Sequence, residues 1–133
     1  MRAENPEDIL RTYLHVRDGG GVDRVEVGEQ FWPELGAGKL PHLDEGRLMS
    51  AFTFKGAWET WERHPAGEEL VMLLSGAASL ILELADSECR IELSCPGEYV
   101  LIPAAIWHTA NAEVETKLLF LTPGAGTEHR LIS

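Results

Sequence analysis

Two short segments of this 133-residue chain carry histidines and glutamates at spacings that suit a metal ion. In the first segment, Glu62 and His64 stand two positions apart, and Glu69 follows the turn-forming residues 65–67. Side chains alternate along a strand, so Glu62 and His64 share a face if residues 58–63 are extended. A reversal at 65–67 then brings Glu69 close to His64, and in the second segment His108 follows a strand that ends at a proline. Imidazole nitrogens and carboxylate oxygens together suit a divalent transition metal.

The same alternation places Trp58 and Thr60 on the face that carries Glu62 and His64. We therefore expect Trp58 and Thr60 to bind the substrate in a pocket beside the metal. The ligand would stack partly on Trp58 or on another aromatic ring, and ordinary core packing is the alternative role for Trp58.

The elements that must position these residues are short strands. Glycines, prolines and an Asp-Ser pair break the chain at intervals of about 8–12 residues, which is typical of an all-β sandwich or barrel. The candidate strands are 47–54, 58–63, 69–74, 77–84, 88–93, 98–102, 106–111 and 116–121.

The sequence before residue 47 predicts a few short helices and strands. Asn5 and Pro6 suit the cap and the first position of a short helix. Residues 12–17 and 22–27 read as strands around a glycine turn, and residues 31–35 as one helical turn. A chain of this length forms one domain overall.

The two segments resemble the two motifs of the cupin family. The first motif of that family is G, five residues, H-x-H, three or four residues, E, six residues, G, and Gly56, His64, Glu69 and Gly76 match it. The second is G, five residues, P-x-G, two residues, H, three residues, N, and it is matched at Gly97, Pro103 and His108. The resemblance implies a small double-stranded β-helix, or jelly-roll, barrel over 47–133 with an internal metal site. Residues 1–46 would be an N-terminal extension packed on that barrel.

The chain departs from the family pattern at three positions. Glu62 stands where the first metal histidine belongs, Ala105 replaces the glycine of P-x-G, and Asn111 comes one residue early. The last two departures concern turn geometry, whereas Glu62 concerns the metal.

Glu62 can serve as a ligand, because a glutamate oxygen is a competent zinc ligand and its reach is similar to that of imidazole. Without a cation, Glu62 and Glu69 would be two partly buried carboxylates at close range, and one would take up a proton. A divalent ion removes this conflict, so we expect a metal held by Glu62, His64, Glu69 and His108. If Glu62 instead pairs with a neighbouring arginine, the other three residues still form a two-histidine, one-carboxylate set. Glu68 is the reserve ligand if the turn shifts by one residue.

Three functions stay open for such a site. The first is a metal-dependent dioxygenase, isomerase or lyase, in which Glu62 exchanges between ligand and general base. The second is a non-catalytic module that binds or senses a small ligand, and the third is a structural cupin whose site has decayed. The ligand types accept iron, manganese, zinc or nickel.

Charge and composition restrict the partners. The net charge of −11 disfavours nucleic acid and anionic membranes, and it favours a small-molecule ligand that is neutral or weakly acidic. The N-terminal residues lack an apolar signal region, and Cys89 and Cys95 fit no common zinc motif, so we expect a cytoplasmic protein with two free thiols.

The remaining expectations concern packing. The apolar run 70–74 reads as a strand buried on both faces, and a second subunit would cover its outer face, which predicts a homodimer. Trp61 and Trp107 should lie on the outer faces of their strands. His15, His42 and His129 have no partner at ligand spacing, so we expect them to be ordinary core or surface histidines.

Overall fold

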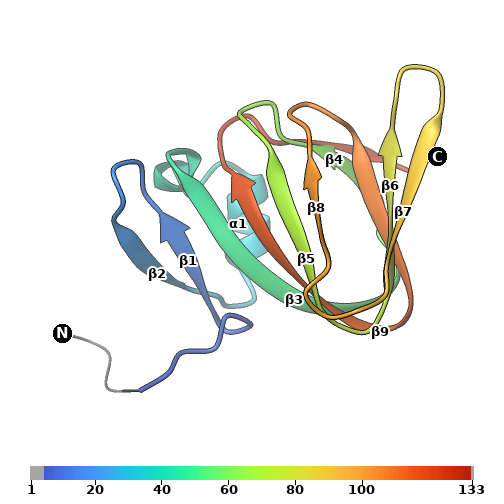
Figure 1. Cartoon of the computed structure of the whole chain (residues 1–133). Helices are drawn as coiled ribbons and strands as arrows, with labels where there is room; N and C mark the ends of the chain where they lie inside the picture. Colours follow the sequence, from blue (N-terminus) through green and yellow to red (C-terminus); the bar gives the residue numbers. More distant parts are fainter. Residues whose placement is uncertain (1–4, 133) are drawn as a thin grey trace.

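Alternating apolar residues fold most of the chain into antiparallel strands that wrap into a barrel (Figure 1). The computed structural model describes residues 5–132. The fold is the all-β jelly-roll barrel that the sequence predicts. Its strands are β3 (Arg47–Ala57), β4 (Thr60–Arg63), β5 (Glu69–Ser75), β6 (Ala78–Glu83), β7 (Glu88–Leu93), β8 (Tyr99–Ile102), β9 (His108–Pro123) and β10 (Glu128–Leu131).

The long strand β9 organises the barrel. It pairs antiparallel with β3, β4, β5 and β6, and β8 and β7 extend the sheet beyond β5 and β6. Glu62 of β4 lies directly opposite His108 at the start of β9. Because one strand contacts four others, β9 brings side chains from distant parts of the sequence to one place.

The barrel core is formed by the inward faces of β5, β6 and β9. Leu73, Leu80 and Leu118 are fully buried there, and each such side chain contributes roughly 1.5–3 kcal/mol by burial. Leu82 pairs with His108 and Ile102 pairs with Glu69, so this apolar packing lies beside two of the predicted ligands. The buried cluster consists of Val71, Leu73, Ala78, Leu80, Leu82, Leu93, Ile102, Ala110, Ala112, Leu118 and Phe120.

The N-terminal part packs on the barrel through a second apolar cluster. It contains β1 (Thr12–Val16), β2 (Val22–Glu26), the helix α1 (Phe31–Gly36) and the 3-10 helix η1 (Pro41–Asp44). Tyr13, Phe31 and Leu43 pack around Leu48 of β3, and β1 pairs with β3 (Figure 1). The division of the chain at residue 47 stays a prediction.

Three expectations about the elements were wrong. Asn5 starts no helix, because the backbone carbonyl and side chain of Asp8 accept hydrogen bonds in a single turn before β1. The expected strands 106–111 and 116–121 are one strand, since β9 continues through exposed residues at one end of the barrel. The strand β10 was not expected, because all four of its residues are exposed and show no apolar alternation.

Ala105 has a left-handed backbone conformation, which glycine adopts more readily than alanine. Its φ of 63° is the only positive φ outside glycine among the described residues, and an alanine there costs about 1–2 kcal/mol. The Ala105 amide donates to the carbonyl oxygen of His64 at 3.1 Å. This turn therefore ties the segment that carries His64 to the entry of the strand that carries His108.

Two further observations concern the cysteines and the helices. Cys89 and Cys95 are free thiols. Among the described residues, no helix is long and apolar enough to cross a membrane.

Candidate metal centre

Four side chains from three strands converge inside one end of the barrel. Glu62 lies on β4 and His64 just after it, Glu69 begins β5 and His108 begins β9. One ligand atom from each residue lies within 4.8 Å of the others. His108 and Glu69 are almost completely buried, with 1% and 2% of their side chains exposed, whereas Glu62 keeps 19%. The structure therefore brings together the four residues that the sequence nominates.

The two histidines present the same nitrogen to the two carboxylates. The Nε2 of His108 lies 2.9 Å from Oε1 of Glu69, and the Nε2 of His64 lies 3.2 Å from Oε2 of Glu69. Oε1 of Glu62 lies 3.4 Å from both of these nitrogens. Four donor atoms thus surround one point, in the mixed nitrogen and oxygen set that divalent transition metals accept.

Three of the atoms at this point lack a hydrogen bond of acceptable geometry to any described residue. They are Nε2 of His64, Oε1 of Glu69 and Nε2 of His108, and all three are buried from solvent. Buried polar atoms in folded proteins are nearly always paired, so three orphans aimed at one point require an explanation. A divalent ion at that point would satisfy all of them, and the donor set therefore fits a metal.

The opposite atoms of the same side chains are held by hydrogen bonds. His108 Nδ1 donates to the carbonyl oxygen of Ile106 at 3.0 Å, which leaves Nε2 of the neutral ring free as a ligand. The Thr122 hydroxyl donates to Oε2 of Glu69 at 2.6 Å. His64 Nδ1 lies 2.9 Å from the hydroxyl of Thr127. Such outer partners orient ligands in metal sites.

The charges of the four groups shift one another's pKa values. Burial alone would lower the pKa of His64, but its contacts with Glu62 and Glu69 raise that pKa to about 9. The same opposing effects raise the pKa of His108 to about 10. Burial alone would raise the pKa of both carboxyls, yet the histidines hold the pKa of Glu62 well below its usual range and lower that of Glu69. Without a cation the two histidines carry the protons and both carboxyls stay charged, so the expectation that one carboxyl would take up a proton was wrong.

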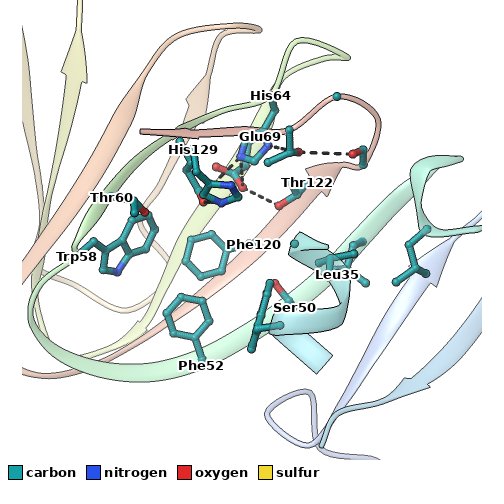
Figure 2. Close-up of a pocket in the computed structure, with 18 of the residues that line it drawn as sticks. Leu35, Ser50, Phe52, Trp58, Thr60, His64, Glu69, Phe120, Thr122 and His129 are labelled. Atoms are coloured by element: carbon teal, nitrogen blue, oxygen red, sulfur yellow. Dashed lines mark hydrogen bonds and ion pairs between the residues drawn. The ribbon is translucent and has the colours of Figure 1, made fainter. Parts of the chain in front are cut away.

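A cavity of about 890 Å³ opens onto this cluster (Figure 2). Glu62, His64 and Glu69 line it, whereas His108 is not part of its wall. No lysine or arginine occurs among the described residues of the wall. The apolar part of the wall consists of Trp32, Leu35, Leu43, Leu48, Phe52, Phe54, Trp58 and Phe120, and the polar part includes Ser50, Thr60, Thr122, Thr127, Asp44, Glu59 and His129.

Aromatic rings form one side of the cavity. Phe52 stacks on Phe120 with centroids 5.0 Å apart and planes at 18°, and Trp58 lies 5.9 Å from Phe120. Figure 2 shows the rings of Phe52 and Phe120 next to each other, with His64 and Glu69 above them. Trp58 and Thr60 thus lie on the cavity wall, as the alternation of the sequence predicts for them. Their role in binding a substrate stays a prediction.

The structure also bears on the alternative ligands and contacts that the sequence left open. Glu68 is exposed and takes no part in the site. Glu62 contacts histidines, and the nearest arginine in sequence, Arg63, pairs with Glu128 instead. Trp107 lies outside the site, where the guanidinium of Arg63 stacks 4.6 Å from its ring.

Comparisons with known proteins bear on the fold. No family model matches this sequence, and neither does any curated protein. Among solved structures, vicilin from Capsicum annuum superposes on 71% of this chain with a TM-score of 0.55 at 14% identity, which covers 28% of the vicilin. Oxalate decarboxylase from Bacillus subtilis covers 65% of this chain with a TM-score of 0.54 at 17% identity, through 24% of its own length.

The chain shares the barrel fold of these two proteins. A cupin-2 domain protein from Shewanella frigidimarina is also similar, at 22% identity over 58% of this chain and 70% of its own, with a TM-score of 0.48. The identities are low, so the similarities to the vicilin and the decarboxylase establish the fold alone. The chain spans about a quarter of the vicilin and of the decarboxylase that it matches.

One residue that contacts this candidate site was not predicted from the sequence. His129 was expected to have no partner, but its Nε2 lies 3.4 Å from Oε2 of Glu62. The expectation was wrong because it depended on β10, the strand without an apolar pattern, which pairs with β4 and places His129 opposite Glu62. His15 and His42 lie together in the N-terminal part, where His15 contacts the carbonyl oxygen of Glu45.

Binding of a divalent ion should release about two protons per ion near neutral pH, because both imidazoles must lose a proton to act as ligands. The affinity should therefore increase with pH up to the histidine pKa values of about 9 and about 10. Titration calorimetry of Zn²⁺ in buffers of different ionisation enthalpy measures the number of protons. Release of no proton would contradict the charge balance described for this cluster.

Proposed function

We propose that the chain binds one divalent transition metal ion through Glu62, His64, Glu69 and His108, and that a small organic molecule occupies the adjoining cavity. The three orphaned buried atoms that face one another are the observation that carries this proposal. Iron, manganese, zinc and nickel all accept two imidazoles and two carboxylates.

The residues of the site would have different roles. When bound, the ion supplies Lewis-acid or oxygen-binding chemistry. His64, Glu69 and His108 are the buried ligands, and each is oriented by a hydrogen bond on its far side. Glu62 is the most exposed of the four and lines the cavity, so it is the residue that can leave the ion and take a proton from a bound molecule. Dioxygenase, isomerase and lyase reactions all suit this arrangement.

The cavity favours a ligand without strong negative charge. Asp44 and Glu59 add carboxylates to a wall in which no lysine or arginine has been found among the described residues. Two carboxylate ligands already neutralise a divalent ion, so the centre would offer little net attraction to an anion. We propose a neutral or weakly acidic molecule that stacks on Trp58 and its aromatic neighbours and donates or accepts a hydrogen bond at Thr60.

A non-catalytic ligand-binding module is the second candidate. The observation that favours it is the aromatic wall around Phe52 and Phe120, which provides binding area without polar groups for chemistry. A decayed structural site fits less well, because all four ligand side chains keep their convergent orientation. The free thiols Cys89 and Cys95 support a cytoplasmic location as part of this proposal.

The proposed homodimer has a matching surface on the outer face of the sheet. Leu101 pairs with Leu70, Leu70 with Leu121 and Leu121 with Met49, which forms an apolar row across four strands. Leu101 is 55% exposed. In a chain with a net charge of −11, this uncharged row is a face on which two copies can meet without opposing carboxylates.

Replacement of Glu62 by glutamine tests whether it is a ligand, because the change keeps the shape and removes the charge. Zn²⁺ affinity of Glu62→Gln, measured by competition with a chromophoric chelator, should fall by more than the roughly 10–100-fold that loss of an outer partner costs. Glu59→Gln removes the same charge from the same cavity and should bind Zn²⁺ like wild type. Equal affinities for the two variants would mean that Glu62 is not a ligand.

The charge preference of the cavity can be measured with benzamide and benzoate, which share a ring and differ in charge. We expect metal-loaded protein to bind benzamide at least about 10-fold more tightly, equivalent to about 1.4 kcal/mol. Tryptophan fluorescence follows both titrations. The Glu59→Gln variant should show a smaller difference in affinity between benzamide and benzoate than wild type does. Tighter binding of benzoate would overturn the proposed ligand class.

Sedimentation velocity tests the dimer. Wild type should sediment as a dimer, and Leu101→Glu should sediment as a monomer because it places a charge within the apolar row. Leu84→Glu changes another exposed leucine, outside that row, and should leave the dimer intact. A monomeric wild type at micromolar concentration would refute the proposal.

A further inference from the structure

We infer that the C-terminal segment 124–131 is a strap that completes the metal centre, with Thr127 and His129 as positioning residues for His64 and Glu62. This inference rests on the proposed metal function, because it names the residues that would hold two of the four ligands in place.

The first support is the pairing of the strand that carries Glu62. The strand β4 pairs with β10 at four positions, from Thr60 opposite Leu131 to Arg63 opposite Glu128. On its other side β4 pairs with β9 only at Glu62 and His108. The backbone that presents Glu62 and leads into His64 therefore depends on β10 for most of its ladder hydrogen bonds.

The second support is that the strap reaches the ligand atoms that face away from the centre. The hydroxyl of Thr127 lies 2.9 Å from His64 Nδ1 and also 3.5 Å from the carbonyl oxygen of Gly124. If the hydroxyl donates to Gly124, its oxygen accepts a hydrogen bond from the Nδ1–H of His64, and His64 Nε2 is left as a ligand. His129 Nε2 lies 3.4 Å from Glu62 Oε2, whereas Oε1 of Glu62 faces the two histidine ligands.

The third support is the alternation of side chains along the strap. Thr127 and His129 face the site, whereas Glu128 and Arg130 face outward. Glu128 pairs with Arg63 at 2.9 Å, and Arg130 pairs with Glu83 at 2.7 Å.

Arg130 also fastens the strap to the outer surface of the barrel. Its guanidinium lies 4.6 Å from the ring of Trp107 and 5.4 Å from that of Trp61. Exposed contacts of this kind contribute about 0.5–1 kcal/mol each. The strap is therefore held outside the apolar core, and changes in its inward residues should leave the barrel folded.

The test is Zn²⁺ affinity of full-length protein, measured by chelator competition, together with the visible absorption spectrum of the Co²⁺ form. Thr127→Val and His129→Leu should each weaken Zn²⁺ binding by about 10–100-fold and alter the Co²⁺ spectrum. Thr127→Ser and His129→Gln keep a polar group at each position and should restore binding to within a few-fold of wild type. Urea unfolding of the metal-free variants checks that the fold is retained.

The outcomes separate the strap from the metal site itself. If wild type binds Zn²⁺ tightly and both Thr127→Val and His129→Leu bind it equally well with unchanged Co²⁺ spectra, the strap is not part of the centre. If wild type binds neither ion, the proposed function fails, and the inference fails with it. If Thr127→Val does not fold, His129→Leu and its glutamine partner decide the question in the same way.

Discussion

The structure around the candidate site depends on how two buried carboxylates are neutralised. Glu62 and Glu69 lie close together inside the barrel, and their negative charges face the imidazoles of His64 and His108. Two protons can satisfy this cluster, as the raised histidine pKa values indicate. A divalent ion provides the same two charges at one point and also pairs the atoms that otherwise have no hydrogen bond. The site is therefore poised between a doubly protonated state and a metal-bound state.

The fold serves this charge balance by collecting side chains from distant segments. The strand β9 contributes His108 and Thr122, pairs with β4 and β5, and so places them against Glu62 and Glu69. The turn at Ala105 joins His64 to the entry of β9. Each ligand has its inner atom at the centre and its outer atom near a second group, which is the pattern of preorganised metal sites. The aromatic wall then defines a cavity on the exposed side of Glu62.

Much of this could be predicted from the sequence because strand alternation is a strong local rule. Period-2 spacing puts Glu62 and His64 on one face, and the turn before Glu69 returns the chain beside them. The cupin resemblance added His108, which local rules alone cannot place. The predictions that failed depended on contacts between residues far apart in the sequence, or on segments without an apolar pattern. The strand β10 is exposed throughout, so its pairing with β4 and the contact between His129 and Glu62 leave no trace in hydrophobic periodicity. Asp8 displaced the expected helix because a single turn satisfied its neighbours before β1 began.

Glu62 sets the net charge of the proposed centre, since a histidine at that position would leave the centre with net positive charge. X-ray absorption of the zinc-loaded protein measures the ligands directly. The account predicts about four nitrogen and oxygen neighbours at about 2.0–2.2 Å, with outer-shell scattering from two imidazoles, and loss of one oxygen neighbour in Glu62→Gln. A spectrum without imidazole scattering, or one that Glu62→Gln leaves unchanged, would contradict it.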